Sequence, residues 1–280
     1  MLNASIMLLV GFFAGTMGAI LGIGGGMIIT PIITLGMGLN IKYAIGASIV
    51  AVIATSSGST IAFLKDDVLN IRVAMFLEIA TSIGAIIGAL LTGVFDPEIL
   101  YFLFGCLLLF SSWNMYRKLK NGQEVLHRAT PDKLATKLKL NSSYYDKNSH
   151  QQIDYQVENI PIGFMIMFGA GFASGLLGIG SGAFKVMALD NAMKMPLKPS
   201  SATSNLMMGV TAAASAAIYF FNGSIRPEIA VPLSLGIIVG AALGSHIMQK
   251  LPSKVIRLIF IPILIYLGLQ MICKTFGVNI

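Results

Sequence analysis

The chain has 280 residues, of which 55% are hydrophobic and 11% are charged, and its mean hydropathy is +0.80. Because an ordinary soluble domain has roughly a quarter of its residues charged, this composition excludes a soluble globular protein and predicts a polytopic membrane protein. The formal net charge is +7, but eight of the 19 Lys and Arg residues lie between Arg117 and Lys147. Such clustering is typical of a loop on the cytoplasmic side of a membrane, so we expect a lipid bilayer and no nucleic acid as a partner.

The first half contains two short apolar stretches followed by three long ones. A helix needs roughly 20 apolar residues to cross the bilayer core, and the stretches 5–21 and 27–37 are shorter than that. They flank a glycine-rich break. The longer stretches, each able to span a membrane, are 41–64, 73–94 and 99–116.

A polar segment separates this half from a second half that repeats its plan. The segment 117–160 is the only substantial water-facing stretch, and the sequence does not decide whether it folds. We therefore divide the chain into a first membrane repeat at 1–116, a basic cytoplasmic linker loop at 117–160 and a second membrane repeat at 161–280. The apolar stretches of the second repeat are 161–179, 183–193, 200–221, 229–248 and 255–273.

The two halves align without a gap at a constant offset of 156 positions. Leu21 to Gly26 read L-G-I-G-G-G, and Leu177 to Gly182 read L-G-I-G-S-G. A register held over such a length indicates an internal duplication. Further pairs at the same offset are Gly15 and Gly171, Lys42 and Lys198, Ser48 and Ser204, Thr55 and Thr211, and Ser59 and Ser215.

The distribution of Lys and Arg favours inverted halves. If each half crossed the membrane four times, 12 of these residues would lie inside and 6 outside, with Lys185 left out of this count and the next because it lies near the second break. If the two short stretches instead enter and return as a re-entrant pair, each half crosses three times, and the counts become 15 inside and 3 outside. The second arrangement fits the positive-inside rule better. We expect an all-α polytopic fold with two inverted repeats, the central loop inside and both termini outside.

The glycine runs are candidate binding elements for an anion. Non-helical backbone at membrane depth is tolerated where it is buried in protein or lines a watery cavity, and the helix that follows points its positive N-terminus at the membrane middle. Paired broken helices in the two halves of a transporter indicate a substrate site at the midplane. The candidate residues in the two runs are Gly22, Gly24, Gly25, Gly26, Gly178, Gly180, Ser181 and Gly182.

The alternative for any glycine in a membrane helix is close packing between helices. We expect packing for four glycines spaced four apart in apolar stretches, and a site for the denser runs. The four glycines are Gly84, Gly88, Gly240 and Gly244.

Hydroxyl side chains form a second repeated pattern. Ser48, Thr55 and Ser59 share one helical face, and the second half repeats the spacing with Asn205 alongside. These groups either line a pathway or bond back to their own backbone, as Ser and Thr in membrane helices often do. The candidate ligands for an anion are Ser48, Thr55, Ser204, Asn205 and Thr211.

Two ionisable residues lie inside or near the apolar stretches. Lys185 follows the second glycine run, where the first half has Ile29, and an ammonium at this depth usually marks a partner or a substrate. It either neutralises a bound anion, pairs with Asp190, or extends to the membrane surface. Glu78 is a candidate for proton coupling, unless it simply reaches the interface from the loop at Arg72.

The sequence contains no pattern for an enzyme, a metal or a cofactor. The histidines are scattered without metal-ligand spacing, and the glycine runs have neither the G-x-G-x-x-G order nor a following G-K-[ST]. No H-E-x-x-H, no G-x-S-x-G and no paired intramembrane acids occur. We therefore expect a protein that is not an enzyme and that binds no cofactor or metal.

The motifs resemble those of the sulfite exporter TauE/SafE family, also called the TSUP anion permeases. The resemblance rests on G-T-M-G-A-I-L-G-I-G-G-G-M-I-I-T-P from Gly15 to Pro31, A-I-G-A-S ending at Ser48, and the second copy with S-A-T-S-N ending at Asn205. It implies a membrane carrier for small sulfur-containing or organic anions such as sulfite and sulfonates. The second copy departs from the first, because Ser181 replaces a glycine and Met187 stands opposite Pro31, so unequal half-sites are expected.

We therefore expect a secondary transporter of the cell membrane, an exporter of a small anion that works by alternating access. Two alternatives remain at this stage, namely an anion channel and a membrane scaffold whose central loop binds a partner. The sequence is compatible with a homodimer. Export is what the family resemblance implies, since the sequence itself does not identify the anion, the direction of transport or the coupling ion.

Overall fold

The computed structural model describes residues 4–21, 24–65, 67–121, 132–146, 150–250 and 253–276. Over these residues the chain forms the expected all-α bundle, and six helices are long and apolar enough to cross a membrane. Among the described residues these six include Ile160–Leu177, which was expected to be part of a re-entrant pair, and do not include the last helix, which was expected to be a span. The first half of the chain contains α1 (Ala4–Leu21), α2 (Gly26–Pro31), η1 (Ile32–Gly36), α3 (Ile41–Lys65), α4 (Ile71–Thr92) and α5 (Pro97–Asn121). The second half contains α7 (Ile160–Leu177), α8 (Gly182–Met187), η2 (Ala188–Ala192), α9 (Leu197–Phe221), α10 (Pro227–Lys250) and α11 (Ser253–Thr275).

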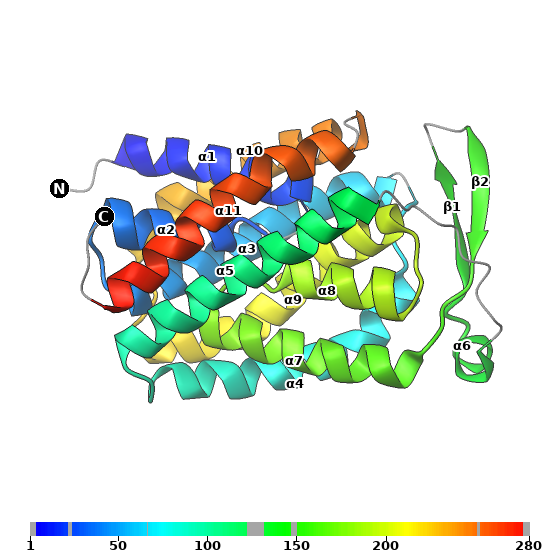
Figure 1. Ribbon diagram of the computed structural model, residues 1–280, viewed down its shortest axis with the longest axis horizontal. Helices are drawn as coiled ribbons and strands as arrows, with labels where there is room; N and C mark the ends of the chain where they lie inside the picture. Colours follow the sequence, from blue (N-terminus) through cyan, green and yellow to red (C-terminus); the bar gives the residue numbers. More distant parts are fainter. Residues whose placement is uncertain are drawn as a thin grey trace.

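Helices of the two repeats are interleaved rather than segregated (Figure 1). α1 packs along α10 in the same direction, because Gly236 meets Leu8 and Gly244 meets Thr16. α4 packs along α7 in the same way. Each of these two closely packed pairs therefore contains one helix from each half of the chain.

The helices that align at the offset of 156 cross each other in opposite directions. Gly46 near the start of α3 lies against Ser224 after the end of α9, whereas Ser56 farther along α3 bonds to Asn205 near the start of α9. α5 and α11 show the same relation, and their opposite directions can be followed by colour in Figure 1.

Close packing explains the glycines that the sequence analysis assigned to it. A Cβ atom added at Gly84 or Gly88 would collide with backbone of α7, and one added at Gly240 or Gly244 would collide with backbone of α1. Backbone atoms cannot move aside as a flexible side chain can. The prediction that these four glycines allow helices to approach closely is confirmed.

We expect Gly171→Ala to destabilise the protein by about 1–3 kcal/mol, the usual cost of overpacking. The added methyl group would meet backbone atoms of Thr81 on α4. Gly169→Ala is the matched control on the same helix, since nothing lies within 4 Å of its Cβ position. The melting temperature of detergent-purified protein measures both effects. Equal melting temperatures for the two variants would contradict the packing argument.

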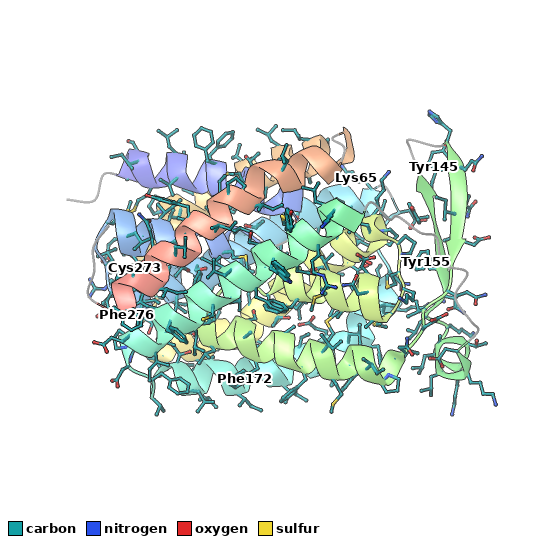
Figure 2. All side chains as sticks on the ribbon, viewed as in Figure 1. Lys65, Tyr145, Tyr155, Phe172, Cys273 and Phe276 are labelled. Atoms are coloured by element: carbon teal, nitrogen blue, oxygen red, sulfur yellow. The ribbon has the colours of Figure 1, made fainter. Side chains whose placement is uncertain are left out.

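The central segment, whose folding the sequence left open, contains secondary structure. It forms α6 (Lys133–Lys137) and an antiparallel hairpin of β1 (Ser142–Asp146) and β2 (Gln151–Tyr155). The hairpin lies at one end of the bundle, at the same end as Lys65, whereas Cys273 lies at the opposite end (Figure 2). α1 begins and α11 ends on the side away from the hairpin (Figure 1).

Asn70 holds this segment against the bundle. Its side chain caps α4 by accepting a bond from the Val73 amide, and it donates bonds to Leu140 O at 2.8 Å and to Tyr155 OH at 3.1 Å. Burial raises the pKa of the Tyr155 phenol, so this hydroxyl remains protonated in the contact. The segment is therefore a docked part of the structure, packed beside the connection from η2 to α9.

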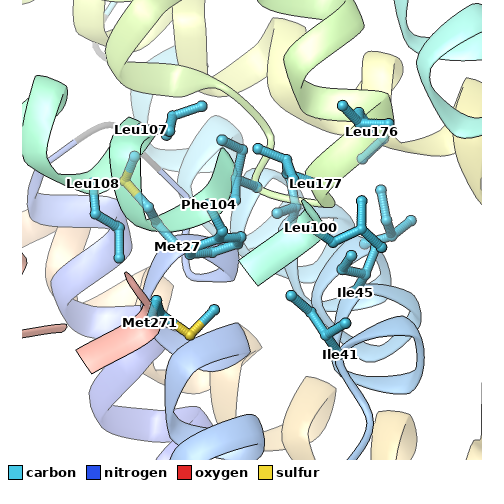
Figure 3. Packing of buried hydrophobic residues seen from close by; sticks show 14 of the residues in the cluster. Met27, Ile41, Ile45, Leu100, Phe104, Leu107, Leu108, Leu176, Leu177 and Met271 are labelled. Atoms are coloured by element: carbon cyan, nitrogen blue, oxygen red, sulfur yellow. The ribbon is translucent and has the colours of Figure 1, made fainter. Parts of the chain in front are cut away.

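The hydrophobic core positions the first glycine break. Met27, just after the break, packs among Ile45 of α3, Phe104 of α5, Leu177 of α7 and Met271 of α11 (Figure 3). The core thus draws side chains from both repeats around one broken segment. Large apolar side chains on the outer faces are exposed in the isolated chain, as suits a lipid-facing surface; on α4 they are Ile71, Met75, Ile79, Ile83, Ile86, Ile87 and Leu90.

Candidate functional site

The two glycine breaks lie in the middle of the bundle, where α3 and α9 cross. Gly24 and Gly180 both have a positive φ, +77° and +70°, which favours glycine over other residues. Both contact the same two side chains, Val52 and Met208. A Cβ atom at Gly24 would lie 3.2 Å from Met208 Sδ, and one at Gly180 would lie 2.7 Å from Val52 Cγ1.

These four residues form two pairs at the offset of 156, since Gly24 aligns with Gly180 and Val52 with Met208. The breaks therefore meet face to face around two equivalent apolar side chains. Sequence reasoning missed Val52 and Met208, because apolar residues in an apolar helix carry no signal of their own. The repeat register pairs the two positions, although it does not mark them as central.

The second break ends α7 by a run of left-handed residues. Gly178 has φ +66°, Gly180 has φ +70° and Ser181 has φ +47°, so the chain leaves the helical path before α8 begins. The Ser181 hydroxyl is buried and has no hydrogen-bond partner. An unpaired polar atom at this depth is costly, and it marks the second break as a place where a polar ligand would be stabilised.

Several predicted hydroxyl groups connect α3 and α9 to the breaks. Ser48 Oγ donates to Gly178 O at 2.6 Å, and Ser204 Oγ donates to Gly182 O at 3.2 Å. Thr55 Oγ1 accepts the Gly25 amide at 3.3 Å while it donates to Ala51 O at 2.9 Å. In this conformation these hydroxyl protons are therefore used by backbone carbonyls rather than left free for an anion.

Other predicted residues hold the two crossing helices together. Ser59 donates to Thr55 O and also lies 3.4 Å from Asn205 Oδ1, and Asn205 Nδ2 donates to Ser201 O at 3.0 Å. A Cβ atom at Gly26 would collide with Ser48 Oγ. Gly22 lies outside the described residues.

The charged candidates meet at a single hydroxyl. Lys185 Nζ donates to Thr211 Oγ1 and to Met207 O, the latter at 3.0 Å. Thr211 Oγ1 lies 2.7 Å from Glu78 Oε1 and donates to it or to Met207 O, also 2.7 Å away. Ser82, which sequence reasoning did not single out, donates to the same Glu78 oxygen at 3.1 Å. Lys185, Thr211 and Glu78 thus form one connected group drawn from α8, α9 and α4.

The burial of Lys185 and Glu78 decides whether these side chains extend to the membrane surface. Lys185 is 0% exposed and Glu78 is 8% exposed, so neither side chain extends to the surface. The bonds of Lys185 go to α9. Two of its three ammonium protons are used there, which leaves one for a further acceptor.

The charged group belongs to one half of the molecule only. At the offset of 156, Ile29 stands opposite Lys185 and Ser234 stands opposite Glu78, and only the threonine is repeated, as Thr55. Thr55 accepts a backbone amide instead of an ammonium. The two half-sites therefore differ in charge, in line with the unequal glycine runs.

The arrangement offers groups that bind anions. Among the residues that the structure describes, no group of three or more His, Cys, Asp or Glu side chains lies close enough to hold a metal ion. What the centre does offer is an ammonium, hydroxyl groups and the amino ends of two broken helices. Together these groups suit a small anion.

Comparison with known proteins finds a matching family model and several similar proteins. Residues 7–271 match the family model described as Sulfite exporter TauE/SafE. The probable membrane transporter protein YunE of Bacillus subtilis is 28% identical over 95% of this chain and 96% of its own length. A probable membrane transporter protein of Methanocaldococcus jannaschii is 28% identical over 95% of this chain and 94% of its own. No solved structure matches the chain.

Proposed function

Since the chain belongs to the sulfite exporter TauE/SafE family of membrane transporters, we propose that it carries a small sulfur-containing or organic anion, such as sulfite or a sulfonate, by alternating access. The observation that supports this most is a fully buried lysine on the short helix that follows the second of the two paired helix breaks. An ammonium in that position is costly unless it has a partner, and an anionic substrate is one.

The binding site in this proposal lies between the breaks and the crossing of α3 and α9. Lys185 supplies the positive charge, and the unpartnered Ser181 hydroxyl supplies a donor. The hydroxyls of Ser48 and Ser204, now bonded to break carbonyls, become available when the breaks move apart. Val52 and Met208 close the centre in the present conformation.

Alternating access in this proposal is a rocking of one inverted repeat against the other. The opposite directions of α3 and α9 support inversion, as does the re-entrant path of α1, α2 and η1 (Figure 1). The hairpin lies at one end of the bundle, and the start of α1 and the end of α11 lie at the other. Because the basic residues cluster in the central segment, we place that segment in the cytoplasm and the termini outside, in the cell membrane.

Thermal stabilisation by a panel of anions tests the proposal. The panel consists of sulfite, sulfate, thiosulfate, taurine, methanesulfonate, acetate and phosphate. A ligand that binds only the folded state stabilises by about 2.7 kcal/mol at 100 times its dissociation constant. We expect a saturable rise in melting temperature with one sulfur anion. No shift with any anion, from folded and monodisperse protein, would contradict the proposed substrate class.

Counterflow in proteoliposomes separates a carrier from a channel. A carrier accelerates entry of labelled anion when unlabelled anion waits on the far side, because its loaded form returns faster than its empty form. A channel has no such return step. Entry of label that is independent of the internal anion would overturn alternating access.

A further inference from the structure

One oxygen of Glu78 is buried and has no hydrogen-bond donor. Oε1 accepts a hydrogen bond from Ser82 and is connected to Lys185 through Thr211, whereas Oε2 has no hydrogen-bond partner. An ionised carboxylate that is 8% exposed normally has donors on both oxygens. The unpartnered Oε2 is therefore a natural place for a proton.

The groups around Glu78 leave one positive charge to balance it. Its polar neighbours on α4 are the hydroxyls of Thr81 and Ser82, and Thr211 faces it from α9. α7 carries no titratable side chain, and the charged group that faces Glu78 among the described residues is Lys185 on α8. Without a substrate, the ammonium and the carboxylate together have no net charge.

A monoanion placed beside Lys185 changes that balance. With Glu78 ionised, the site would hold two negative charges and one positive charge in surroundings of low dielectric, where like charges repel strongly. With Glu78 protonated, the same site would again be neutral. Binding of the anion is therefore favoured together with uptake of one proton.

We propose that Glu78 is the counter-ion of Lys185 when no substrate is bound, and that each anion binds together with one proton, which Glu78 accepts. This inference rests on the proposed function. It names the coupling ion and the residue that carries it.

The hydrogen bonds of the group can accommodate the exchange. The proton comes from water on the side to which the site is open, and it forms an O–H bond on Oε2. Thr211 then turns its own hydroxyl proton to Met207 O, which lies 2.7 Å away. Lys185 keeps its bond to Met207 O and directs its remaining ammonium protons to the anion.

The test measures anion affinity against pH for the monoanions methanesulfonate and ethanesulfonate, whose charges do not change near neutral pH. Because a proton is bound with the anion, affinity should rise as the pH falls, by about tenfold per pH unit wherever free Glu78 is ionised. Glu78→Gln removes the titrating group but keeps its size. We expect this variant to bind both anions independently of pH, and at least as tightly as the wild type does at low pH.

Glu98→Gln is the matched control, since Glu98 is an exposed carboxylate in the first turn of α5. It should keep the pH dependence of the wild type. Calorimetry of the wild type in buffers of different ionisation enthalpy gives the proton count without any variant, and we expect about one proton per anion.

The outcomes separate the inference from the proposed function. Intact anion binding with zero proton uptake by the wild type, or an unchanged pH slope in Glu78→Gln, would overturn the counter-ion role alone. No binding of either anion by wild type or variant at any pH would remove the proposed sulfonate class as well.

Discussion

Lys185→Met is expected to raise the dissociation constant of the transported anion by about 10- to 100-fold and to abolish uptake into proteoliposomes. Hydrogen bonds to a charged group contribute about 1.5–3 kcal/mol, and each 1.4 kcal/mol corresponds to a factor of ten. Methionine keeps the length and volume of the side chain while it removes the charge. Lys185 is fully buried, so bulk solvent does not reach the position of the ammonium to replace it.

The same substitution should also lower stability, because it leaves the buried Glu78 carboxylate without its positive partner. Removing one member of a buried charged pair costs about 3–5 kcal/mol. The double variant Lys185→Met with Glu78→Gln removes both charges, so we expect it to regain most of the lost melting temperature and yet fail to bind the anion. That combination separates a role in binding from a role in folding.

Lys65→Met is the matched control, because Lys65 is exposed at the end of α3. It should leave both affinity and melting temperature near the wild-type values. If the double variant is stable and still transports the anion at the wild-type rate, Lys185 has no part in the site.

Length and periodicity account for most of the fold that the sequence predicted. The stretches 5–21 and 27–37 are too short to span, and the structure folds them as α1 and the pair α2–η1 on either side of the glycine run. The expected helix boundaries agree with the observed ones within a few residues, since glycine and proline mark most ends. Helix boundaries are local properties, so a single sequence contains them.

The folding of the central segment depends on distant partners. The hairpin from Ser142 to Tyr155 is held by Asn70, and Val157 donates its amide to Asn141. Neither contact has a periodic signal, and strand pairing over so few residues is marginal without support. The segment therefore could not be predicted to fold from its own sequence.

The sequence predicted the residues of the candidate site but not the contacts between them. Lys185, Thr211 and Glu78 were each singled out by residue type at membrane depth, but nothing in the sequence indicates that one hydroxyl joins them. Glu78 lies in the first repeat and the other two in the second. Their meeting depends on how α4 packs against α9, which is a tertiary property.

Gly180→Ala is the second substitution for which we expect a large effect. The added methyl group meets Val52 Cγ1 at 2.7 Å, and the positive φ of +70° is strained for alanine. We expect a loss of about 1–3 kcal/mol from overpacking and about 1 kcal/mol more from the backbone. Transport should fall by more than about tenfold, because a displaced break misplaces the following helix.

Two further variants divide this loss into its parts. Gly38 also has a positive φ, +65°, but nothing lies within 4 Å of its Cβ position, so Gly38→Ala measures the backbone cost alone. Val52→Ala in the Gly180→Ala background makes room for the new methyl group and should recover the overpacking part only. If Gly180→Ala lowered the melting temperature no more than Gly38→Ala does, contact between Val52 and the break would not constrain the centre. If the double variant instead regains both transport and stability, transport requires that the breaks stay closely packed. The contact with Val52 and Met208 is then part of the closed state.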